Sequence, residues 1–324
     1  MEMLALAATN LTSPVVLFFV LGFAAALARS DLSVPEAVAK GISLYLLLAI
    51  GFKGGAGVAA SGLDARLAAS LLAGVILSAA IPFVAYALLR AMTRLDATNA
   101  AAVAAHYGSI SIVTFVAMTS LLDGRGIAYE GYMVAVAAAM EAPAILSALF
   151  ITARAGSADK PMDRELMREV MLNGSIVLLT GAFAIGWITG EAGLERIAPF
   201  IVAPFQGVLC FFLLDMGLIA ARGLRGSAKS LSGRVIAFGI LMPLIGAAFG
   251  LVTGWLLGLS TGGIAILTTL SASASYIAVP AAMRVALPQA NPGIYLTLSL
   301  GVTFPFNLTV GLALYLTLAQ MIGG

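Results

Sequence analysis

Long apolar stretches, each followed by a short polar segment, run along almost the whole chain. A helix needs about 20 apolar residues to cross the hydrocarbon core of a membrane. Dividing the sequence at its charges, prolines and glycine clusters gives ten such stretches, which predict an all-α integral membrane protein with ten transmembrane helices. The predicted spans are 13–29, 35–53, 66–90, 97–122, 127–153, 170–190, 197–221, 232–258, 261–287 and 292–322.

Two of these stretches contain short polar runs where the chain should lie deepest in the membrane. His106 to Ser111 interrupts the fourth stretch, and Ser271 to Tyr276 interrupts the ninth. An unpaired backbone N–H or C=O is costly in lipid, so such a run is tolerated where it lines a cavity enclosed by protein. Paired interruptions in the two halves of a chain are typical of transporters, and they predict broken fourth and ninth helices around a transport site.

The two halves of the chain resemble each other weakly. Residues 46–52 match residues 212–218, and Glu141-Ala142-Pro143 matches Thr303-Phe304-Pro305. These matches share an offset of roughly 162 to 168 residues, which indicates an internal repeat. Each half has an odd number of predicted helices, so the repeat must be inverted in the membrane. The predicted organisation is a first five-helix repeat over 1–155, a cytoplasmic linker over 156–169 and a second, inverted five-helix repeat over 170–324.

Composition agrees with this class of protein and excludes several others. Hydrophobic residues make up 61% of the chain and charged residues 10%, which is unlike a soluble domain. The net charge of +2 is small and its basic residues are scattered, so we expect no nucleic-acid partner. The single cysteine, Cys210, excludes an intrachain disulfide and a cysteine-rich metal site. We therefore expect no transition-metal site and no cofactor.

The basic residues predict how the chain is oriented. Ten crossings put both termini on one side, and that side receives Lys53, Arg66, Arg125 and Arg196. The remaining Lys and Arg residues, out of 17 in the chain, fall on the opposite side. By the positive-inside rule both termini lie outside, on the periplasmic face of the cell inner (plasma) membrane. The first stretch is followed rather than preceded by a basic residue, so we expect it to be retained rather than cleaved as a signal peptide.

Glu141 is the leading candidate for a functional charge. It lies among apolar residues near the middle of the fifth stretch, where a carboxylate costs roughly 2.5 to 3.5 kcal/mol even on insertion scales. It must be protonated, paired or bound to a cation. Pro143 frees a backbone carbonyl beside it, and carboxylate and carbonyl oxygens suit a hard cation such as sodium. Thr303 and Asn307 offer neutral oxygens at the matching place in the second half, where a second cation site is possible.

The polar runs are the candidate anion site. Their serines alternate with small residues, which favours an extended crossing. Serine hydroxyls can donate hydrogen bonds to anions and can coordinate sodium through their oxygen. Half-helices that restart near Ile112 and Tyr276 would direct N–H groups at one spot. A purely structural helix crossing remains the alternative. The predicted anion-binding residues are Ser109, Ile110, Ser111, Ser273, Ala274, Ser275 and Tyr276, and the predicted sodium-binding residues are Glu141, Thr303, Ser111 and Tyr107.

Three further charged or titratable residues lie in or near predicted spans. His106 suits a proton relay, although a structural role is the preferred interpretation. Asp215 lies seven residues before Arg222, so we expect it to pair with a cation or to extend toward the membrane surface. Arg284 should anchor the cytoplasmic end of the ninth helix, with a role in gating the anion left open.

The chain resembles the sodium-dependent bicarbonate transporters over nearly its whole length. Relatives carry a glycine where this chain has Ile112 and an aspartate where it has Tyr276, so its ligand shell is less polar. The likeness is clearest at Tyr107 to Ser111 with Thr119 to Leu122 and Ile127 to Glu130, at Met140 to Ala144, and at Pro280 to Arg284 with Leu287 to Tyr295 and Thr303 to Pro305.

The resemblance implies ten helices in two inverted repeats, with sodium and bicarbonate held between the broken fourth and ninth helices. It also implies a homotrimer and, in some relatives, a PII-like regulator that binds from the cytoplasm. We therefore expect a sodium-coupled symporter of a small anion, bicarbonate first. The alternatives are a sodium/proton antiporter using Glu141 with His106, or a symporter of another small anion or organic acid. An enzyme is not expected, because His106 precedes Ser109 by only three residues and no Gly-x-Ser-x-Gly motif occurs.

Overall fold

The computed structural model describes residues 11–62, 65–154, 168, 172, 174–227, 232–276, 279–280, 283 and 287–323. Every regular element in these residues is a helix. Eight of the described helical segments are long and apolar enough to cross a membrane, and two apolar helices are shorter. The predicted all-α, multi-span membrane protein is thus confirmed.

Most helices follow the predicted stretches, although α3 continues to Ser61, beyond the predicted end at 53. The helices are α2 (Pro14–Leu27), α3 (Glu36–Ser61), α4 (Ala65–Met92), α5 (Ala97–Gly108), α6 (Ile112–Asp123), α7 (Met133–Ala139), α8 (Pro143–Arg154), α10 (Gly174–Ile201), α11 (Phe205–Ser227), α12 (Gly233–Leu256), α13 (Thr261–Ala272), α15 (Pro292–Leu298), η1 (Ser299–Thr303), α16 (Phe304–Phe306), η2 (Asn307–Gly311) and α17 (Leu312–Ile322).

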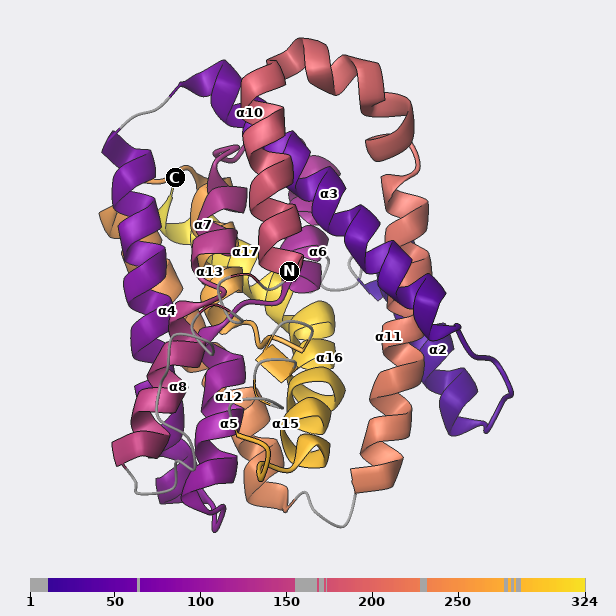
Figure 1. Cartoon of the computed structure of the whole chain (residues 1–324), viewed down its shortest axis with the longest axis vertical. Helices are drawn as coiled ribbons and strands as arrows, with labels where there is room; N and C mark the ends of the chain where they lie inside the picture. Colours follow the sequence, from indigo (N-terminus) through magenta and orange to yellow (C-terminus); the bar gives the residue numbers. More distant parts are fainter. Residues whose placement is uncertain are drawn as a thin grey trace.

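The helices form two groups. In one group α10 packs along α3 and α11 packs along α2, while α4, α5, α8, α12, α13 and α17 pack together in the other (Figure 1). Helices α3 and α11 face the second group, where they contact α7 and α15. The first group is held by backbones in close approach: a Cβ at Gly22 of α2 would overlap the carbonyl of Leu214, and one at Gly186 of α10 would overlap that of Phe52. Small residues allow this kind of packing between membrane helices.

Helix α10 departs from the predicted boundaries. The sequence predicted helices over 170–190 and 197–221. The segment α10 is interrupted at Gly190, where φ +60° and ψ −152° are not helical, so its first piece ends where predicted. A second helical piece reaches Ile201, and α11 begins only at Phe205. Gly190 has φ +60°, a conformation that costs glycine little, and it turns the helix into an arch over one end of the molecule (Figure 1). The far arm is tied to α3, because the Tyr45 hydroxyl donates to the Phe200 carbonyl at 2.6 Å.

Helix α5 begins with a side-chain cap. Oδ1 of Asp96 accepts from the Asn99 N–H at 2.8 Å, and Oδ2 accepts from the Asn99 side-chain amide at 2.6 Å. Burial raises the pKa of the Asp96 carboxyl, but the hydrogen bonds donated by Asn99 and nearby backbone outweigh this and hold its pKa below the usual value. The cap satisfies N–H groups that a helix leaves free at its start.

The last span contains two wider turns. It runs from α15 through the π-helical turns η1 and η2 to α17, with Pro305 in the short α16 between them. Proline removes a backbone donor from the helix, and π-turns are frequent at functional sites. Thr303 ends η1 and Asn307 begins η2, so both polar side chains predicted here lie at these irregular turns.

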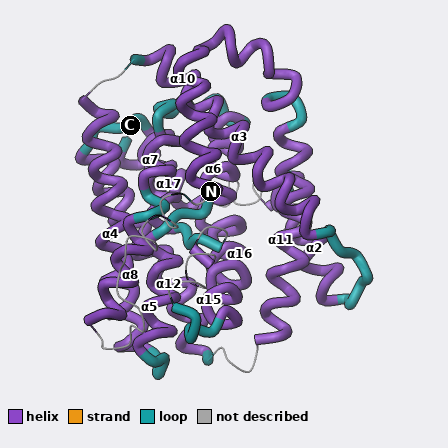
Figure 2. Tube along the Cα trace, in the orientation of Figure 1, coloured by secondary structure: helices purple, strands orange, loops and turns teal. Residues whose placement is uncertain are grey.

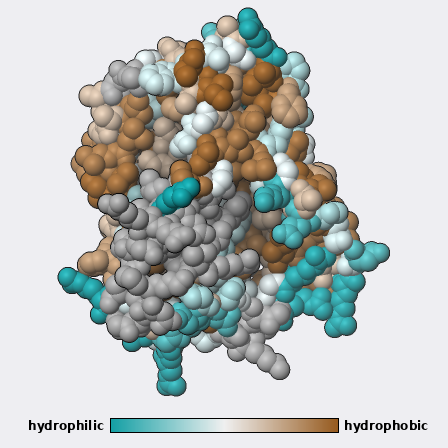
Figure 3. Space-filling model, viewed as in Figure 1, coloured by the Kyte–Doolittle hydropathy of each residue, from teal (hydrophilic) through white to brown (hydrophobic). Residues whose placement is uncertain are grey.

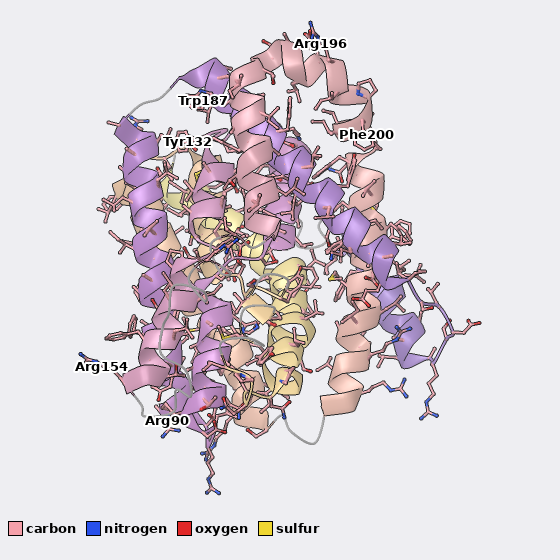
Figure 4. All side chains as sticks on the ribbon, in the orientation of Figure 1. Arg90, Tyr132, Arg154, Trp187, Arg196 and Phe200 are labelled. Carbon is pink, nitrogen blue, oxygen red and sulfur yellow. The ribbon has the colours of Figure 1, made fainter. Side chains whose placement is uncertain are left out.

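The surface agrees with a membrane environment. Apolar side chains cover much of the upper part of the visible face, and polar residues gather along its lower edge (Figure 3). Arg90 and Arg154 lie at one end of the molecule and Arg196 at the other (Figure 4).

Candidate functional site

The fourth span is broken where the sequence predicted. Helix α5 ends at Gly108, and α6 begins at Ile112 with Ser111 as its N-cap. The Ser111 hydroxyl oxygen accepts from the Thr114 N–H at 3.2 Å and from the Thr114 hydroxyl at 2.9 Å. Non-helical chain therefore lies in the middle of the molecule as well as at its ends (Figure 2). The break is stabilised by its own serine, as the alternation of polar and small residues indicated.

The break in the fourth span is bonded directly to the run that follows α13. The Ser111 N–H donates to Oγ of Ser273 at 2.9 Å, and the Ser275 N–H donates to the His106 carbonyl at 2.7 Å. The predicted crossing of the two polar runs is thus present. Helix α13 ends at Ala272, but most of 277–286, where the ninth span was predicted to restart, lies outside the described residues. Arg284 is among those residues.

The fifth span is broken as well, at Glu141. Helix α7 ends at Ala139 and α8 begins at Pro143, whereas the sequence predicted one span over 127–153. Glu141 is 5% exposed, and its Oε2 accepts from the Ser109 hydroxyl at 3.1 Å. The Met140 carbonyl, next to it in the break, accepts from the Ser78 hydroxyl at 2.6 Å. A buried carboxylate therefore lies beside the break in the fourth span.

Tyr107 and Thr303 form a second polar cluster. Their hydroxyl oxygens lie 2.6 Å apart, and the Thr303 hydroxyl donates to the Gly239 carbonyl at 2.7 Å. Gly239 lies four residues before Pro243, inside α12. Proline has no N–H, so this carbonyl lacks its usual helical donor, and Thr303 supplies one. The sequence analysis did not identify Gly239, although Pro243 within an apolar stretch was the signal that could have revealed it.

The predicted sodium ligands thus divide between two clusters. Glu141 is hydrogen-bonded to Ser109, whereas Thr303 is hydrogen-bonded to Tyr107, and no hydrogen bond joins Glu141 to Thr303 among the described residues. Asn307, the other neutral candidate, donates to the Ala272 carbonyl at 3.0 Å and accepts from the Tyr315 hydroxyl at 2.7 Å.

A small pocket lies at the crossing. Its volume is about 20 Å³, which is room for about one water-sized group. It contains most of the predicted anion-binding residues together with Glu141, but Ser109, Ser273 and Ala274 do not line it. The lining residues are Ser43, Leu46, Leu47, Ile110, Ser111, Ile112, Val113, Glu141, Phe212, Ser275 and Tyr276. The wall contributed by α3 and α11, which includes Ser43, Leu47 and Phe212, was missed because these residues carry no charge or motif.

A larger cavity of about 950 Å³ adjoins this pocket. The two share Ser43, Leu47, Phe212 and Tyr276. The larger cavity extends to the first turn of α3, the last turns of α11 and the start of α15. On the opposite side of the crossing, a cavity of about 290 Å³ is lined by Lys53, Asp123 and Tyr129 among others. The central pocket therefore borders a wide cavity that extends toward one end of the molecule.

His106 and Asp215 are both buried. The Nδ1 of His106 lies 2.6 Å from the Ala102 carbonyl, and its ring stacks on Tyr295 with centroids 4.6 Å apart. His106 has no contact with Glu141 in the described structure, which fits the structural interpretation. Asp215 is 4% exposed, and Arg222 instead donates to the Leu32 carbonyl at 2.6 Å. Asp215 therefore does not extend to the surface, and the predicted close pairing with Arg222 is absent.

Comparison with protein families identifies a family for this chain. A family model, that of the Na+-dependent bicarbonate transporter superfamily, matches residues 14–320. The search of curated proteins found no match. The matched region includes both broken spans, Glu141 and every residue of the central pocket.

Proposed function

The chain belongs to the Na+-dependent bicarbonate transporter superfamily, and from that premise we propose that it is a secondary active transporter coupling inward sodium movement to uptake of a small anion, bicarbonate first. The observation that carries the proposal is the central pocket, where a buried carboxylate and the start of a half-helix line the same small space. Glu141 offers oxygen ligands to a cation and the start of α6 offers N–H donors to an anion, and because the pocket has room for about one water-sized group in this state, it must widen to hold both. We propose no enzymatic activity.

We propose that the anion binds at the N-terminus of α6. Ile112 and Val113 open this helix and line the pocket, and the first N–H groups of a helix lack acceptors in a preceding turn. The positive end of the helix dipole adds to their attraction for an anion. Ser275 lines the same pocket from the other half of the chain, and its hydroxyl is available on that wall. Ser111 and Ser273 act mainly by holding the two runs together.

We propose that sodium binds at Glu141. The carboxylate is buried and its Oε2 has a hydroxyl donor, Ser109, but no basic residue bonded to it in the described structure. A carboxylate buried without a counter-charge disfavours an anion nearby, because their repulsion is strong in a medium of low polarity. Sodium bound first removes this repulsion. We therefore propose that the anion binds tightly only after sodium, while Tyr107 and Thr303 hold the adjoining helices in place.

The inverted repeat is supported by reciprocal packing. Helix α2 is the first described helix of the first half, and α10 is the first long helix after the midpoint of the chain. Helix α2 packs along α11, and α10 packs along α3. In the same way α4 contacts α5 and α8, while α12 contacts α13 and α17. If each element of 1–155 is equivalent to the element one repeat later, every one of these pairs corresponds to another. We propose two five-helix repeats on this basis, with residues 156–169 as the linker.

The large cavity supports movement between two states. It is lined by Glu36, Arg222 and Pro292, which lie at helix ends that the charge distribution assigns to the cytoplasm. Arg90 and Arg154 lie at one end of the molecule and Arg196 at the other, as this orientation in the inner membrane requires (Figure 4). We propose that the structure is the state open to the cytoplasm, and that movement of one helix group against the other exposes the pocket to the outside.

The test is uptake of labelled bicarbonate into proteoliposomes with and without an inward sodium gradient. Glu141→Gln should lower sodium-dependent uptake at least about tenfold, a loss of roughly 1.4 kcal/mol in binding free energy. Glu191→Gln is the matched control, because Glu191 is exposed on the outer arm of α10 and should leave uptake unchanged. Uptake that ignores sodium, or that survives Glu141→Gln, contradicts the proposal. Sodium/proton exchange without anion uptake favours the antiporter, and uptake of another small anion changes only the substrate.

Assembly and regulation remain predictions from the family resemblance. We propose a homotrimer, which mass measurement of the detergent-solubilised protein would test. A PII-like regulator would bind the cytoplasmic face, and most of the linker that lies there is outside the described residues.

A further inference from the structure

Asp215 is a buried acid that the proposed transport site does not use. It lies on α11 with 4% of its surface exposed, and its Oδ2 has no hydrogen-bond partner among the described residues. Glu141, by contrast, has the Ser109 hydroxyl as a donor and belongs to the other group of helices. A carboxylate buried without donors is strongly disfavoured unless a proton or a cation accompanies it.

The side chain faces the larger cavity. Asp215 lines that cavity, and so does Ser43, which also lines the central pocket. Ser43 thus borders both spaces, and an ion that entered the cavity from the central pocket would enter a space lined by Asp215. A carboxylate and a hydroxyl are hard oxygen ligands of the kind that bind small alkali and alkaline-earth cations.

The other charges of this cavity do not neutralise Asp215 by contact. Glu36 and Lys40 are exposed residues in the first turns of α3. Arg222 attracts the carboxylate electrostatically, but its side chain is exposed and donates to the Leu32 carbonyl. Charges exposed to water are screened, whereas a charge in the buried part of the cavity is not.

We propose that Asp215 forms a second binding site for sodium, in the cavity and on the opposite helix group from Glu141. This site rests on the proposed function, because it receives sodium that leaves the central pocket toward the cavity. It lies on α11 rather than on the broken spans, so it need not move with the central pocket. Sodium on the cavity side occupies it first, raises the local cation concentration and slows release from the central pocket. Internal sodium should therefore inhibit uptake through Asp215.

The first experiment measures binding of radioactive sodium to the purified full-length protein without bicarbonate. In Glu141→Gln the central cation site is weakened, and the binding that remains should belong to Asp215. Adding Asp215→Asn should weaken that remaining binding at least tenfold, while adding Glu36→Gln, an exposed acid of the same cavity, should change it less than twofold. Asp215→Glu should retain binding because it keeps the carboxylate. No remaining binding in Glu141→Gln, or remaining binding that persists in Asp215→Asn, overturns the proposal.

The second experiment distinguishes this site from the transport function itself. The proteoliposomes are loaded with sodium on the cavity side. The internal sodium concentration that halves uptake should be about five- to tenfold higher for Asp215→Asn than for the wild type. Uptake at zero internal sodium should change much less. If the wild type shows no sodium-dependent uptake but Asp215 still governs sodium binding, the proposed function fails and the second site stands. If uptake depends on sodium but Asp215→Asn leaves both sodium binding and internal inhibition unchanged, the second site is wrong and the function stands.

Discussion

A double-mutant cycle at Tyr107 and Thr303 tests how the irregular last span is held. Thr303→Val keeps the shape of the side chain and removes the hydroxyl that donates to the Gly239 carbonyl and accepts from the Tyr107 hydroxyl. Both partners are then left unpaired in a buried place. Because Pro243 supplies no N–H to Gly239, the helix itself cannot repair the loss.

The magnitude follows from the number of unpaired groups. An unsatisfied buried polar group costs roughly 1 to 3 kcal/mol in soluble proteins, and hydrogen bonds between membrane helices average nearer 0.6 kcal/mol. Thr303→Val leaves two such groups and should cost roughly 1 to 4 kcal/mol of unfolding free energy. Tyr107→Phe leaves the bond from Thr303 to Gly239 intact and should cost about 1 kcal/mol or less. In the double variant only Gly239 is unpaired, so its cost should fall below the sum by about 1 kcal/mol.

The assay is equilibrium unfolding in mixed micelles with increasing SDS, followed by tryptophan fluorescence or circular dichroism. Thr309→Val is the matched control, because the Thr309 hydroxyl donates within its own helix, to the Pro305 carbonyl at 2.7 Å. It should cost less than about 0.5 kcal/mol and show no coupling to Tyr107→Phe. Costs of Thr303→Val and Tyr107→Phe that add within about 0.3 kcal/mol refute the reasoning, since independent sites behave in that way.

Three further changes have defined outcomes. Gly22→Ala should lower the yield and melting temperature of folded protein, because its Cβ would overlap the carbonyl of Leu214, whereas Gly41→Ala, with open space around it, should be neutral or stabilising in the same thermal assay. Asp96→Ala should cost about 1 kcal/mol as a lost helix cap. Folding lowers the pKa of Asp96, so its contribution to stability is present above the unfolded pKa and is lost as pH falls through the folded pKa. Asp96→Asn should keep the cap and remove this acid dependence in thermal melts between about pH 3 and pH 7. Ser109→Ala should raise the sodium concentration for half-maximal uptake roughly tenfold, since a hydrogen bond to a charged group contributes about 1.5 kcal/mol or more, and an unchanged value would show that this hydroxyl does not support the carboxylate.

The span pattern and the break at Ser109 to Ser111 could be predicted because they depend on local composition. Polarity, small residues and a capping serine act within a few neighbours, so the sequence alone indicated that α6 begins at Ile112. The family resemblance was also confirmed. The second break, at Glu141, was only partly foreseen: the buried acid and Pro143 were identified, but a continuous span was expected.

What the sequence could not supply was the pairing between distant groups. The hydroxyls of Tyr107 and Thr303 are 196 residues apart along the chain, and the donor for Gly239 comes from another helix. Such pairing depends on which helices pack together. The start of the seventh span was misplaced for a similar reason. The helical piece between Gly190 and Ile201 was not predicted, and it is held to α3 by the hydrogen bond from Tyr45 to Phe200.

The hydrogen bond between Ser111 and Ser273 can form only late in synthesis of the chain. The two residues are 162 positions apart, so at roughly 5 to 20 residues per second the N–H of Ser111 emerges about 10 to 30 s before its acceptor. During that interval the first half is in or near the membrane with an unfinished break, and water, lipid headgroups or the insertion machinery must satisfy it. The first five spans expressed alone should therefore be prone to degradation, and their lifetime should lengthen when the second half is supplied as a separate chain.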